Sequence, residues 1–184
     1  MKRVGEREFT VYGTPSDAAL IALEALLPRK PRFAVSGINL GYNLGTDVYY
    51  SGTVAAAREA AFAGVKALAV SIERERGEPR WELAARLALE ALKLIEPSEH
   101  LLWNLNVPNI PEVKGIKLAK VGRRGYRDAV RHLEGEYYLI SGTPEKADEP
   151  GTDVWLVERG WAALSPLAVN PTDFQALSSF PEEL

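Results

Sequence analysis

Residues 36–61 read SGINLGYNLGTDVYYSGTVAAAREAA and join an apolar, strand-like run to an alanine-rich helix. Glycine and asparagine are concentrated in the first half, and Ser51, Gly52 and Thr53 come directly before the helix. A glycine-rich loop that ends at a helix start can close its backbone amides around an anion, because those amides are unpaired and the helix dipole favours negative charge. The same composition is also found in ordinary turns. The stretch therefore predicts a strand, a loop and a helix in that order, with anion binding as one use of the loop.

Strands and helices alternate on both sides of this loop. The run at 32–37 is continuously apolar, which is typical of a parallel strand covered on both faces. Thr14 can cap a helix that ends at Pro28, and Gly64 can end the alanine-rich helix. The alternation predicts crossover units around a parallel sheet between residues 9 and 108. The expected strands lie at 8–13, 32–37, 66–71 and 101–108, and the expected helices at 14–28, 53–64 and 78–97.

The helix expected at 78–97 has the clearest amphipathic pattern in the chain. Its periodicity directs Leu83, Leu87 and Leu94 toward a core. After Pro108 the pattern changes to extended segments at 116–124 and 136–144, which indicate a hairpin or arm. A short helix capped by Thr152 and an extended piece at 162–171 follow.

The predicted fold class is α/β, a Rossmann-like three-layer sandwich with a mainly parallel sheet, plus a carboxyl-terminal extended arm or hairpin. We expect residues 1–108 to form the α/β core that carries the loop. Residues 109–184 are expected to form the hairpin or arm and a tail, as part of the same domain and of oligomerisation.

Composition narrows the class of protein. The 184 residues carry a net charge of −3 with acids and bases interspersed, so no basic face indicates binding to a nucleic acid polymer. The absence of cysteine excludes disulfides and thiolate metal sites. The charged opening differs from a signal peptide, and the expected helices are too short and too interrupted to cross a bilayer. These features predict a cytoplasmic protein with no membrane partner.

Polar residues stand at the carboxyl ends of the expected strands, where ligands bind in open parallel sheets. Asn39 offers a neutral carbonyl oxygen to a hard cation such as magnesium or manganese. Its side chain can instead bond the loop backbone, and spacing alone favours this second role. Ser71, Asn104 and Asn106 end the neighbouring strands.

The loop itself leaves two further questions open. Ser51, Gly52 and Thr53 can hold a phosphate at the helix start, or Ser51 and Thr53 can simply cap it. Gly41 and Gly45 are candidates for positive φ, and Asn43 between them can turn outward to a ligand or inward to the loop.

Other polar candidates are weaker. His100 and His132 lack the spacing of a metal site or a catalytic triad, which favours solvated or packed roles. Asp47 is a single loop acid without an evident partner, and no paired-carboxylate motif is present.

Two groups of large side chains complete the set of candidates. A basic cluster near residue 124 can meet an anionic substrate or partner, but such clusters are more often solvated. Large aromatics usually fill a core or an interface. The cluster comprises Arg123, Arg124 and Arg127, and the aromatics are Trp103, Trp155 and Trp161.

In the glycine-rich loop and in the segments named below, the chain resembles the SurE family, the stationary-phase survival proteins that act as divalent-metal-dependent nucleotidases and phosphomonoesterases. YGTPSDAAL is similar to the family's helix start, and residues 35–64 look like its signature loop nearly throughout. LLWNLNVP, VGRRGY and GTDVWLVERGWAALSPLAVNPTD resemble later family segments in the same order, so the likeness covers essentially the whole chain.

The resemblance implies roles for particular residues. Asn39 corresponds to the asparagine that helps to hold the metal, and Ser51, Gly52 and Thr53 correspond to the phosphate-binding segment. Gly37, Gly41, Asn43 and Gly45 then support the loop. Family members open with a strand that ends in two adjacent aspartates, and this chain begins after that point. The catalytic residues are therefore unknown, since the expected aspartates are absent.

The resemblance predicts a metal-dependent phosphomonoesterase that hydrolyses nucleoside monophosphates, a 5′/3′-nucleotidase, with magnesium or manganese as cofactor. The alternative is a non-catalytic phosphate- or nucleotide-binding remnant that pairs with another chain. Family members form dimers and sometimes tetramers, so a homodimer or homotetramer is expected.

Overall fold

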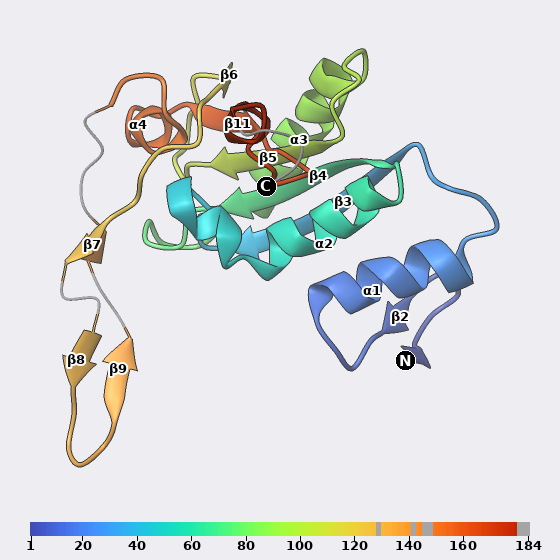
Figure 1. Cartoon of the computed structure of the whole chain (residues 1–184), viewed down its shortest axis with the longest axis horizontal. Coiled ribbons are helices and arrows are strands. Elements are labelled where there is room, and N and C mark those ends of the chain that lie inside the picture. The colour runs from blue at the N-terminus through green and yellow to red at the C-terminus, as the bar shows by residue number, and fades with distance from the viewer. Residues whose placement is uncertain (128–129, 141–142, 145–148, 180–184) are drawn as a thin grey trace.

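The computed structural model describes residues 1–127, 130–140, 143–144 and 149–179. Its centre is a five-stranded sheet with the strand order β3-β4-β5-β11-β6 (Figure 1). β3, β4 and β5 are parallel, whereas β11 runs antiparallel to β5 and parallel to β6. The predicted mainly parallel sheet is therefore confirmed. The strands are β3 (Phe33–Leu40), β4 (Lys66–Ile72), β5 (Leu102–Val107), β11 (Ala162–Pro166) and β6 (Ile116–Leu118).

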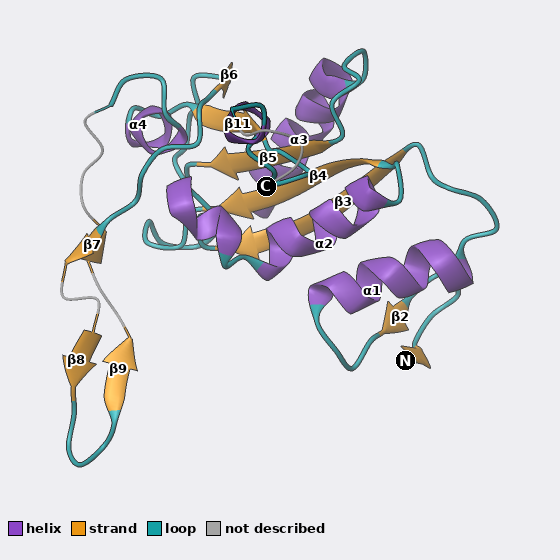
Figure 2. Cartoon of the chain, in the orientation of Figure 1, coloured by secondary structure: helices purple, strands orange, loops and turns teal. Residues whose placement is uncertain are grey.

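Helices cover both faces of the sheet, which gives the three layers (Figure 2). Alternate residues of β4 face opposite sides. Leu68 and Val70 pack with helix α3 (Trp81–Ile95), while Ala67 and Ala69 pack with helix α2 (Gly52–Phe62). Helix α4 (Asp153–Glu158) forms a third apolar cluster with the loop that follows β3. No helix in the described parts of the chain is both long and apolar enough to cross a membrane.

The amino-terminal segment lies beside the sheet rather than in it. β1 (Lys2–Arg3) and β2 (Phe9–Thr10) pair only with each other among the described residues. The strand predicted at 8–13 is thus shorter than expected and does not enter the main sheet, and both of its residues are exposed. Helix α1 (Pro15–Ile21) follows and continues into the π-helix η1 (Ala22–Leu26), and its predicted cap is present as a capping box between Thr14 and Asp17.

A hairpin is present in this part of the chain, as expected, and it projects from the body of the molecule (Figure 1). Of the two extended segments predicted there, only the one at 136–144 contributes to it, because residues 116–118 form β6 in the central sheet. β8 (Val130–His132) and β9 (Tyr138–Ile140) pair antiparallel. β7 (Tyr126–Arg127) and β10 (Thr143–Pro144) pair at its base. The short helix α5 (Phe174–Leu177) lies in the tail.

Two packing predictions differ from the structure. β3, expected to be covered on both faces, is an edge strand that pairs with β4 alone among the described strands, and Val35 is 51% exposed. Leu94 is 59% exposed, whereas Leu87 is buried as predicted. The buried stripe of α3 runs through Ala84, Ala91 and Ile95, and Leu94 lies at its flank.

Candidate functional site

The polar residues at the strand ends lie together at the carboxyl end of the sheet, because parallel strands all finish on the same side. Ser71 on β4 pairs in register with Asn39 on β3 and with Asn106 on β5. Ser71 and Asn106 are fully buried. Helix α2 begins at this same carboxyl end of the sheet, near the arrowheads of β3, β4 and β5 (Figure 1). The strand ends and the helix start therefore form one locus.

Asn43 fixes the loop that follows β3 onto these strand ends. Its N–H donates to Asn106 Oδ1 at 2.8 Å, and its Nδ2 donates to Ser71 Oγ at 2.6 Å. Its carbonyl accepts from Asn104 Nδ2 at 2.8 Å and from Asn106 Nδ2 at 3.1 Å. Asn43 thus turns inward, which decides the question that the sequence left open. Because buried amides that pair on both sides hold a single geometry, this network makes the loop rigid.

Three glycines give the loop its path. Gly37 has φ +127°, and a Cβ there would lie 2.4 Å from the carbonyl oxygen of Val70. Gly45 has φ +54°, and a Cβ would lie 2.9 Å from the carbonyl oxygen of Gly122. Gly41 also has the expected positive φ, and its N–H donates to the Ile72 carbonyl at 2.8 Å.

Asn39 bonds the loop backbone, the role that spacing favoured. Its Nδ2 donates to the Gly41 carbonyl at 2.9 Å. This leaves Oδ1 without a hydrogen-bond donor among the described residues. That oxygen suits one position of a magnesium or manganese site, but the described residues contain no group of three His, Cys, Asp or Glu that could hold a metal ion. By themselves they do not make up a divalent-cation site.

Ser51 caps helix α2, with its Oγ accepting from the Val54 N–H at 3.1 Å. The capping alternative is therefore confirmed for Ser51. Thr53 takes no part in this cap, and the amides of the first turn have no partner inside the helix. Gly52 is close to α1, because a Cβ there would lie 3.1 Å from Pro15 Cγ. The helix start thus presents amides and one hydroxyl that capping does not use.

Asp153 is a central residue of this region that the sequence analysis did not single out. Its Oδ2 accepts from the Gly45 N–H, and its Oδ1 accepts from the Gly122 and Val154 N–H groups, all at 2.8 Å. Burial raises the pKa of this carboxyl, and the backbone donors oppose the rise. An acid in a helix start that is otherwise apolar, DVWLVE, is the signal that could have found it.

Asp47 does have a partner, so its description as an isolated loop acid is wrong. Arg124 Nη1 lies 2.8 Å from Asp47 Oδ2, and both side chains are largely buried. Thr46 Oγ1 also donates to the Arg124 carbonyl at 3.2 Å. The fold brings residues 77 positions apart together, which spacing in the sequence does not reveal. Arg123 is exposed, and the Arg127 side chain lies outside the described residues.

The histidines have the packed or solvated roles that were predicted, with His100 partly buried and His132 exposed. His100 Nε2 lies 3.0 Å from the Leu102 carbonyl oxygen and 2.9 Å from that of Leu167. His132 Nε2 lies 2.7 Å from the Gly135 carbonyl oxygen within the hairpin.

The tryptophans pack against apolar clusters, also as predicted. Trp103 is buried in the core on the α3 side of the sheet. Trp155 and Trp161 are partly buried against the cluster around α4.

Comparisons with known proteins agree on one family. A family model described as Survival protein SurE matches residues 1–128. The chain is 44% identical over 177 residues to 5′-nucleotidase SurE of Symbiobacterium thermophilum, covering 91% of this chain and 69% of that protein. It is 35% identical to 5′-nucleotidase SurE of Mannheimia succiniciproducens, covering 100% of this chain and 77% of that protein. The crystal structure of the SurE protein from Aquifex aeolicus superposes with a TM-score of 0.84 at 30% identity, over 97% of this chain and 77% of that one.

Proposed function

The chain belongs to the SurE family, and from this premise we propose that it is a metal-dependent phosphomonoesterase that releases phosphate from nucleoside monophosphates. Relatives that share 35–45% identity with it are named 5′-nucleotidases, which are hydrolases of phosphoric monoesters. The observation that carries the proposal is the locus where Asn39, the loop held by Asn43 and the start of α2 come together.

The phosphate group of the substrate lies, in this proposal, at the start of α2. The amides of Gly52 and Thr53 and the Thr53 hydroxyl donate to the phosphoryl oxygens, while Ser51 keeps the helix start in place. Donors fixed at the positive end of a helix dipole stabilise the charge that develops on these oxygens without reorganising. The hydrogen bonds of Asn43 and the conformations of Gly37, Gly41 and Gly45 hold the loop beside them.

We propose Asn39 Oδ1 as one ligand of a magnesium or manganese ion, which would supply electrostatic stabilisation of the phosphoryl oxygens. A single neutral oxygen binds such a cation weakly. The remaining ligands and the group that activates water must therefore come from outside the described residues, and the aspartate pair implied by the family resemblance fits that requirement.

A second candidate function is a non-catalytic phosphate- or nucleotide-binding protein that pairs with another chain. The observation that favours it is the combination of a fully formed loop with the lack of an acidic metal group in the described residues. Such a protein would bind a mononucleotide without any added metal and would not hydrolyse it.

The test is release of inorganic phosphate from nucleoside monophosphates, beginning with AMP, with manganese and with magnesium. It is run on the 184-residue chain and on the chain joined at its amino end to an aspartate-bearing segment from a SurE relative, with Asn39→Ala as the matched variant of each. We expect the joined chain to be active. Asn39→Ala should lower its activity by about tenfold or more, because even residues that only orient metal ligands contribute that much.

The assay separates the two candidates. If the joined chain hydrolyses no nucleotide with either metal, the phosphomonoesterase proposal fails. Calorimetry of AMP binding to the 184-residue chain without metal then tests the second candidate, which fails if AMP does not bind.

We further propose a homodimer or homotetramer built through the projecting hairpin, with residues 1–108 as the site-bearing core and 109–184 as the arm and tail. The proposal is supported by the exposed side chains of Tyr137, Tyr138 and Val130 on the hairpin, because apolar side chains that are exposed together mark surfaces for contact with another protein. A cytoplasmic location is part of this proposal.

A further inference from the structure

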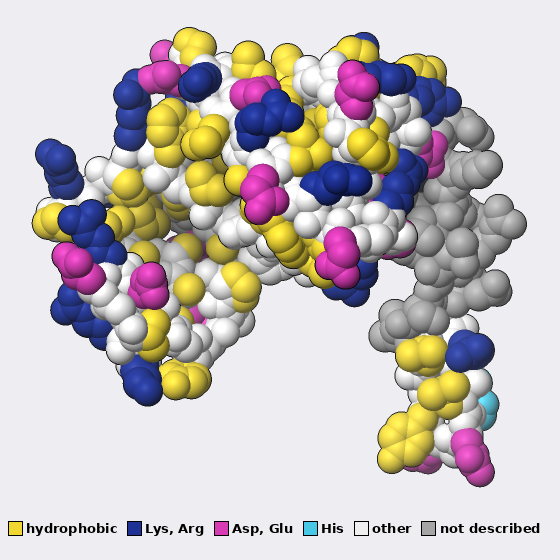
Figure 3. Space-filling model, turned by 180° about the vertical axis from the view of Figure 1, so that it is seen from behind, with side chains coloured by type: hydrophobic (Ala, Val, Ile, Leu, Met, Phe, Trp, Pro, Cys, Tyr) yellow, Lys and Arg dark blue, Asp and Glu magenta, His cyan; other side chains and the backbone are white. Residues whose placement is uncertain are grey.

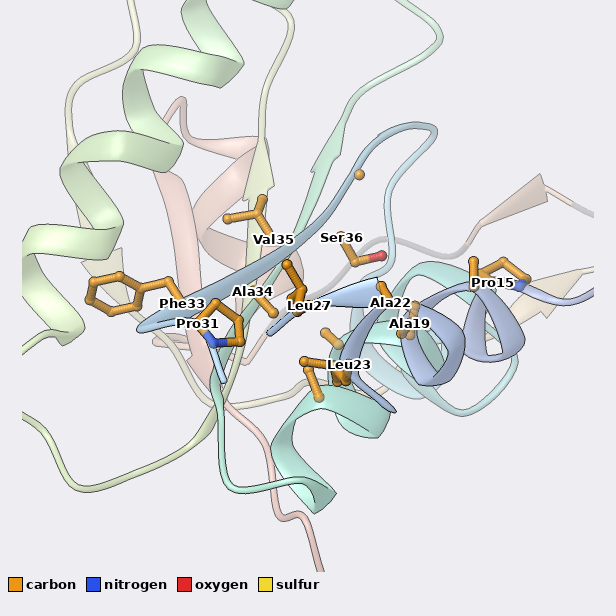
Figure 4. Close-up of a pocket in the computed structure, with 15 residues that line it drawn as sticks. Pro15, Ala19, Ala22, Leu23, Leu27, Pro31, Phe33, Ala34, Val35 and Ser36 are labelled. Atoms are coloured by element: carbon orange, nitrogen blue, oxygen red, sulfur yellow. The ribbon is translucent and has the colours of Figure 1, made fainter. Parts of the chain in front are cut away.

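Helix α2 lies between two hollows of similar volume. One, of about 470 Å³, adjoins β3 and α1 and is lined from α2 by Ala56, Ala57 and Ala60 (Figure 4). The other, of about 480 Å³, is lined from α2 by Arg58 and Phe62. Because an α-helix has 3.6 residues per turn, these two sets of residues face different sides of α2. The first hollow has no charged residue among the described residues that line it, whereas the second has Arg58.

The second hollow, which we call the Arg58 pocket, has an apolar floor and an aromatic rim. Val48 and Leu167 line it and are buried. Tyr49 and Phe62 line it as well, but both are largely exposed, so they lie at its open side. Its volume is typical of pockets that hold one small molecule, and such pockets combine an apolar lining with a few polar groups.

Arg58 carries a positive charge that nothing in the described part of the chain neutralises. The residue is partly buried, and its side chain makes no hydrogen bond, ion pair or ring contact with a described residue. No acidic residue is among the described residues that line the pocket, and the neighbouring loop acid Asp47 is paired with Arg124. Elsewhere basic and acidic side chains lie close together (Figure 3), as Arg86 and Glu90 do on α3 at 3.1 Å. The pocket therefore favours an anion supplied from outside the chain.

A further polar side chain at the pocket is also a hydrogen-bond donor. Asn170 Oδ1 accepts from the Thr172 N–H at 2.9 Å and from Thr172 Oγ1 at 2.7 Å, so this oxygen is already used. Asn170 Nδ2 has no acceptor among the described residues. Arg58 lies inside α2, where the backbone amides are paired, so the donors of the pocket are side chains alone. One guanidinium and one amide suit a carboxylate, which carries a single charge and pairs with arginine through two parallel hydrogen bonds.

We infer that the Arg58 pocket binds one small aromatic carboxylate. The carboxylate pairs with the Arg58 guanidinium, and the ring lies on the apolar floor between Tyr49 and Phe62. Burial of the ring provides affinity because it removes apolar surface of both partners from water, and contacts with the two aromatic side chains add to this affinity. The ion pair provides selectivity for an acid over its neutral analogue.

This pocket is separate from the locus proposed for phosphate. Arg58 lies six residues after Gly52, which is about 9 Å along α2. The inference goes beyond the proposed function and does not depend on it, since a chain without phosphatase activity would keep the pocket.

The experiment is a titration of the 184-residue chain with benzoate, phenylacetate and naphthoate, each beside its neutral carboxamide. Calorimetry measures the dissociation constants, and methyl NMR spectra show which side chains respond. We expect at least one acid to bind and to shift the methyl signals of Val48 and Leu167. Its carboxamide should bind about tenfold or more weakly, because the charge-assisted hydrogen bonds are lost. AMP in excess should not displace the acid.

Two variants test the two parts of the pocket. Arg58→Gln removes the charge and should weaken binding of the acid by about tenfold or more, while binding of the carboxamide stays unchanged. Phe62→Ala removes one aromatic wall and should weaken both ligands alike, by about threefold or more. Arg86→Gln, which removes an exposed guanidinium from α3, is the matched control and should bind as the unaltered chain does. Thermal unfolding checks that all three variants fold.

Four results would overturn the inference. The first is that none of the acids binds. The second is that acid and carboxamide bind equally, or that Arg58→Gln binds the acid as well as the control does. The third is that AMP displaces the acid, since the pocket would then be part of a nucleotide site. The fourth is a dimer of the chain that Arg58→Gln dissociates, because an acidic group of a second copy would then be the partner of Arg58.

Discussion

Asp153 shows how one buried carboxylate can organise a site without belonging to it chemically. Its two oxygens accept from three backbone amides, one in the loop after β3, one at Gly122 and one in its own helix. A glycine is required at Gly45 because the backbone at residues 122 and 124 approaches within contact distance of where a Cβ would be. The carboxylate and the glycine together clamp the loop onto α4.

We predict that Asp153→Asn lowers the free energy of unfolding by about 2 kcal/mol, because an amide nitrogen replaces an oxygen that faces a buried N–H. Asp173→Asn, at the exposed cap of α5, should cost well under 1 kcal/mol and serves as the control. Chemical denaturation measures both. Equal effects of the two substitutions would contradict the role assigned to Asp153.

The effect of Asp153→Asn on the free energy of unfolding should also depend on pH. The pKa of Asp153 is raised in the folded protein, so the folded state holds this proton more tightly than the unfolded state does. Its contribution to stability is therefore fully present below the unfolded aspartate pKa of about 3.9 and is lost as pH rises through the folded value. The stability difference between the unaltered chain and Asp153→Asn should shrink as pH rises through that window. A difference that grows instead would mean that the backbone donors outweigh burial.

At the scale of elements, α2 is positioned by both of its ends. Ser51 caps its start and Gly64, with φ +77°, follows its end. Val54, Ala57 and Ala60 bury its inner face against the sheet. The small side chains allow α2 to lie close to β3 and β4, which brings its first turn to the strand ends where Asn39 lies.

Ser51→Ala and Thr53→Ala should separate capping from ligand binding. Ser51→Ala removes the acceptor for the Val54 N–H and should lower stability by about 1 kcal/mol. Thr53→Ala should stay within about 0.5 kcal/mol, since alanine is a better helix former. Thermal unfolding with and without AMP measures both effects, and the proposed phosphate site requires that Thr53→Ala lose stabilisation by AMP. If AMP stabilises Thr53→Ala and the unaltered chain equally, the Thr53 hydroxyl does not bind phosphate.

At the scale of the whole molecule, one continuous sheet takes strands from both parts of the sequence. β11 enters between β5 and β6, so residues near the carboxyl end complete the core around Leu105 and Leu164. The hairpin of β8 and β9 contributes no buried residue to any of the three apolar clusters. Assembly and folding can therefore be tested separately.

We predict that replacing residues 130–140 with a short glycine linker breaks the oligomer, so that the mass of the particle in solution falls by at least one whole chain. The unfolding temperature of the core should stay within a few degrees. Multi-angle light scattering and calorimetry measure the two quantities. Leu89→Ala, a substitution of another exposed apolar residue, should change neither. An unchanged mass after removal of the hairpin would contradict the proposed assembly.

The sequence by itself predicted the alternation of strands and helices from residue 32 to residue 108 and the caps at Thr14 and Thr152, and it named Gly41 and Gly45 as candidates for positive φ. These features are local, because capping, glycine conformation and periodicity act over a few neighbouring residues. The sequence also predicted correctly that polar residues would gather at the carboxyl end of the sheet, since parallel strands end on the same side.

Only the tertiary structure decided which strand lies at the edge, that Asn43 turns inward, and that Asp47 and Asp153 have partners far along the chain. The apolar run of β3 indicates a strand with neighbours, but a sequence does not say whether those neighbours are present. The partners of Asp153 at Gly45 and Gly122 are 108 and 31 residues away. Such contacts exist only once the sheet has brought distant segments together, so the free edge and the clamped loop were properties of the fold.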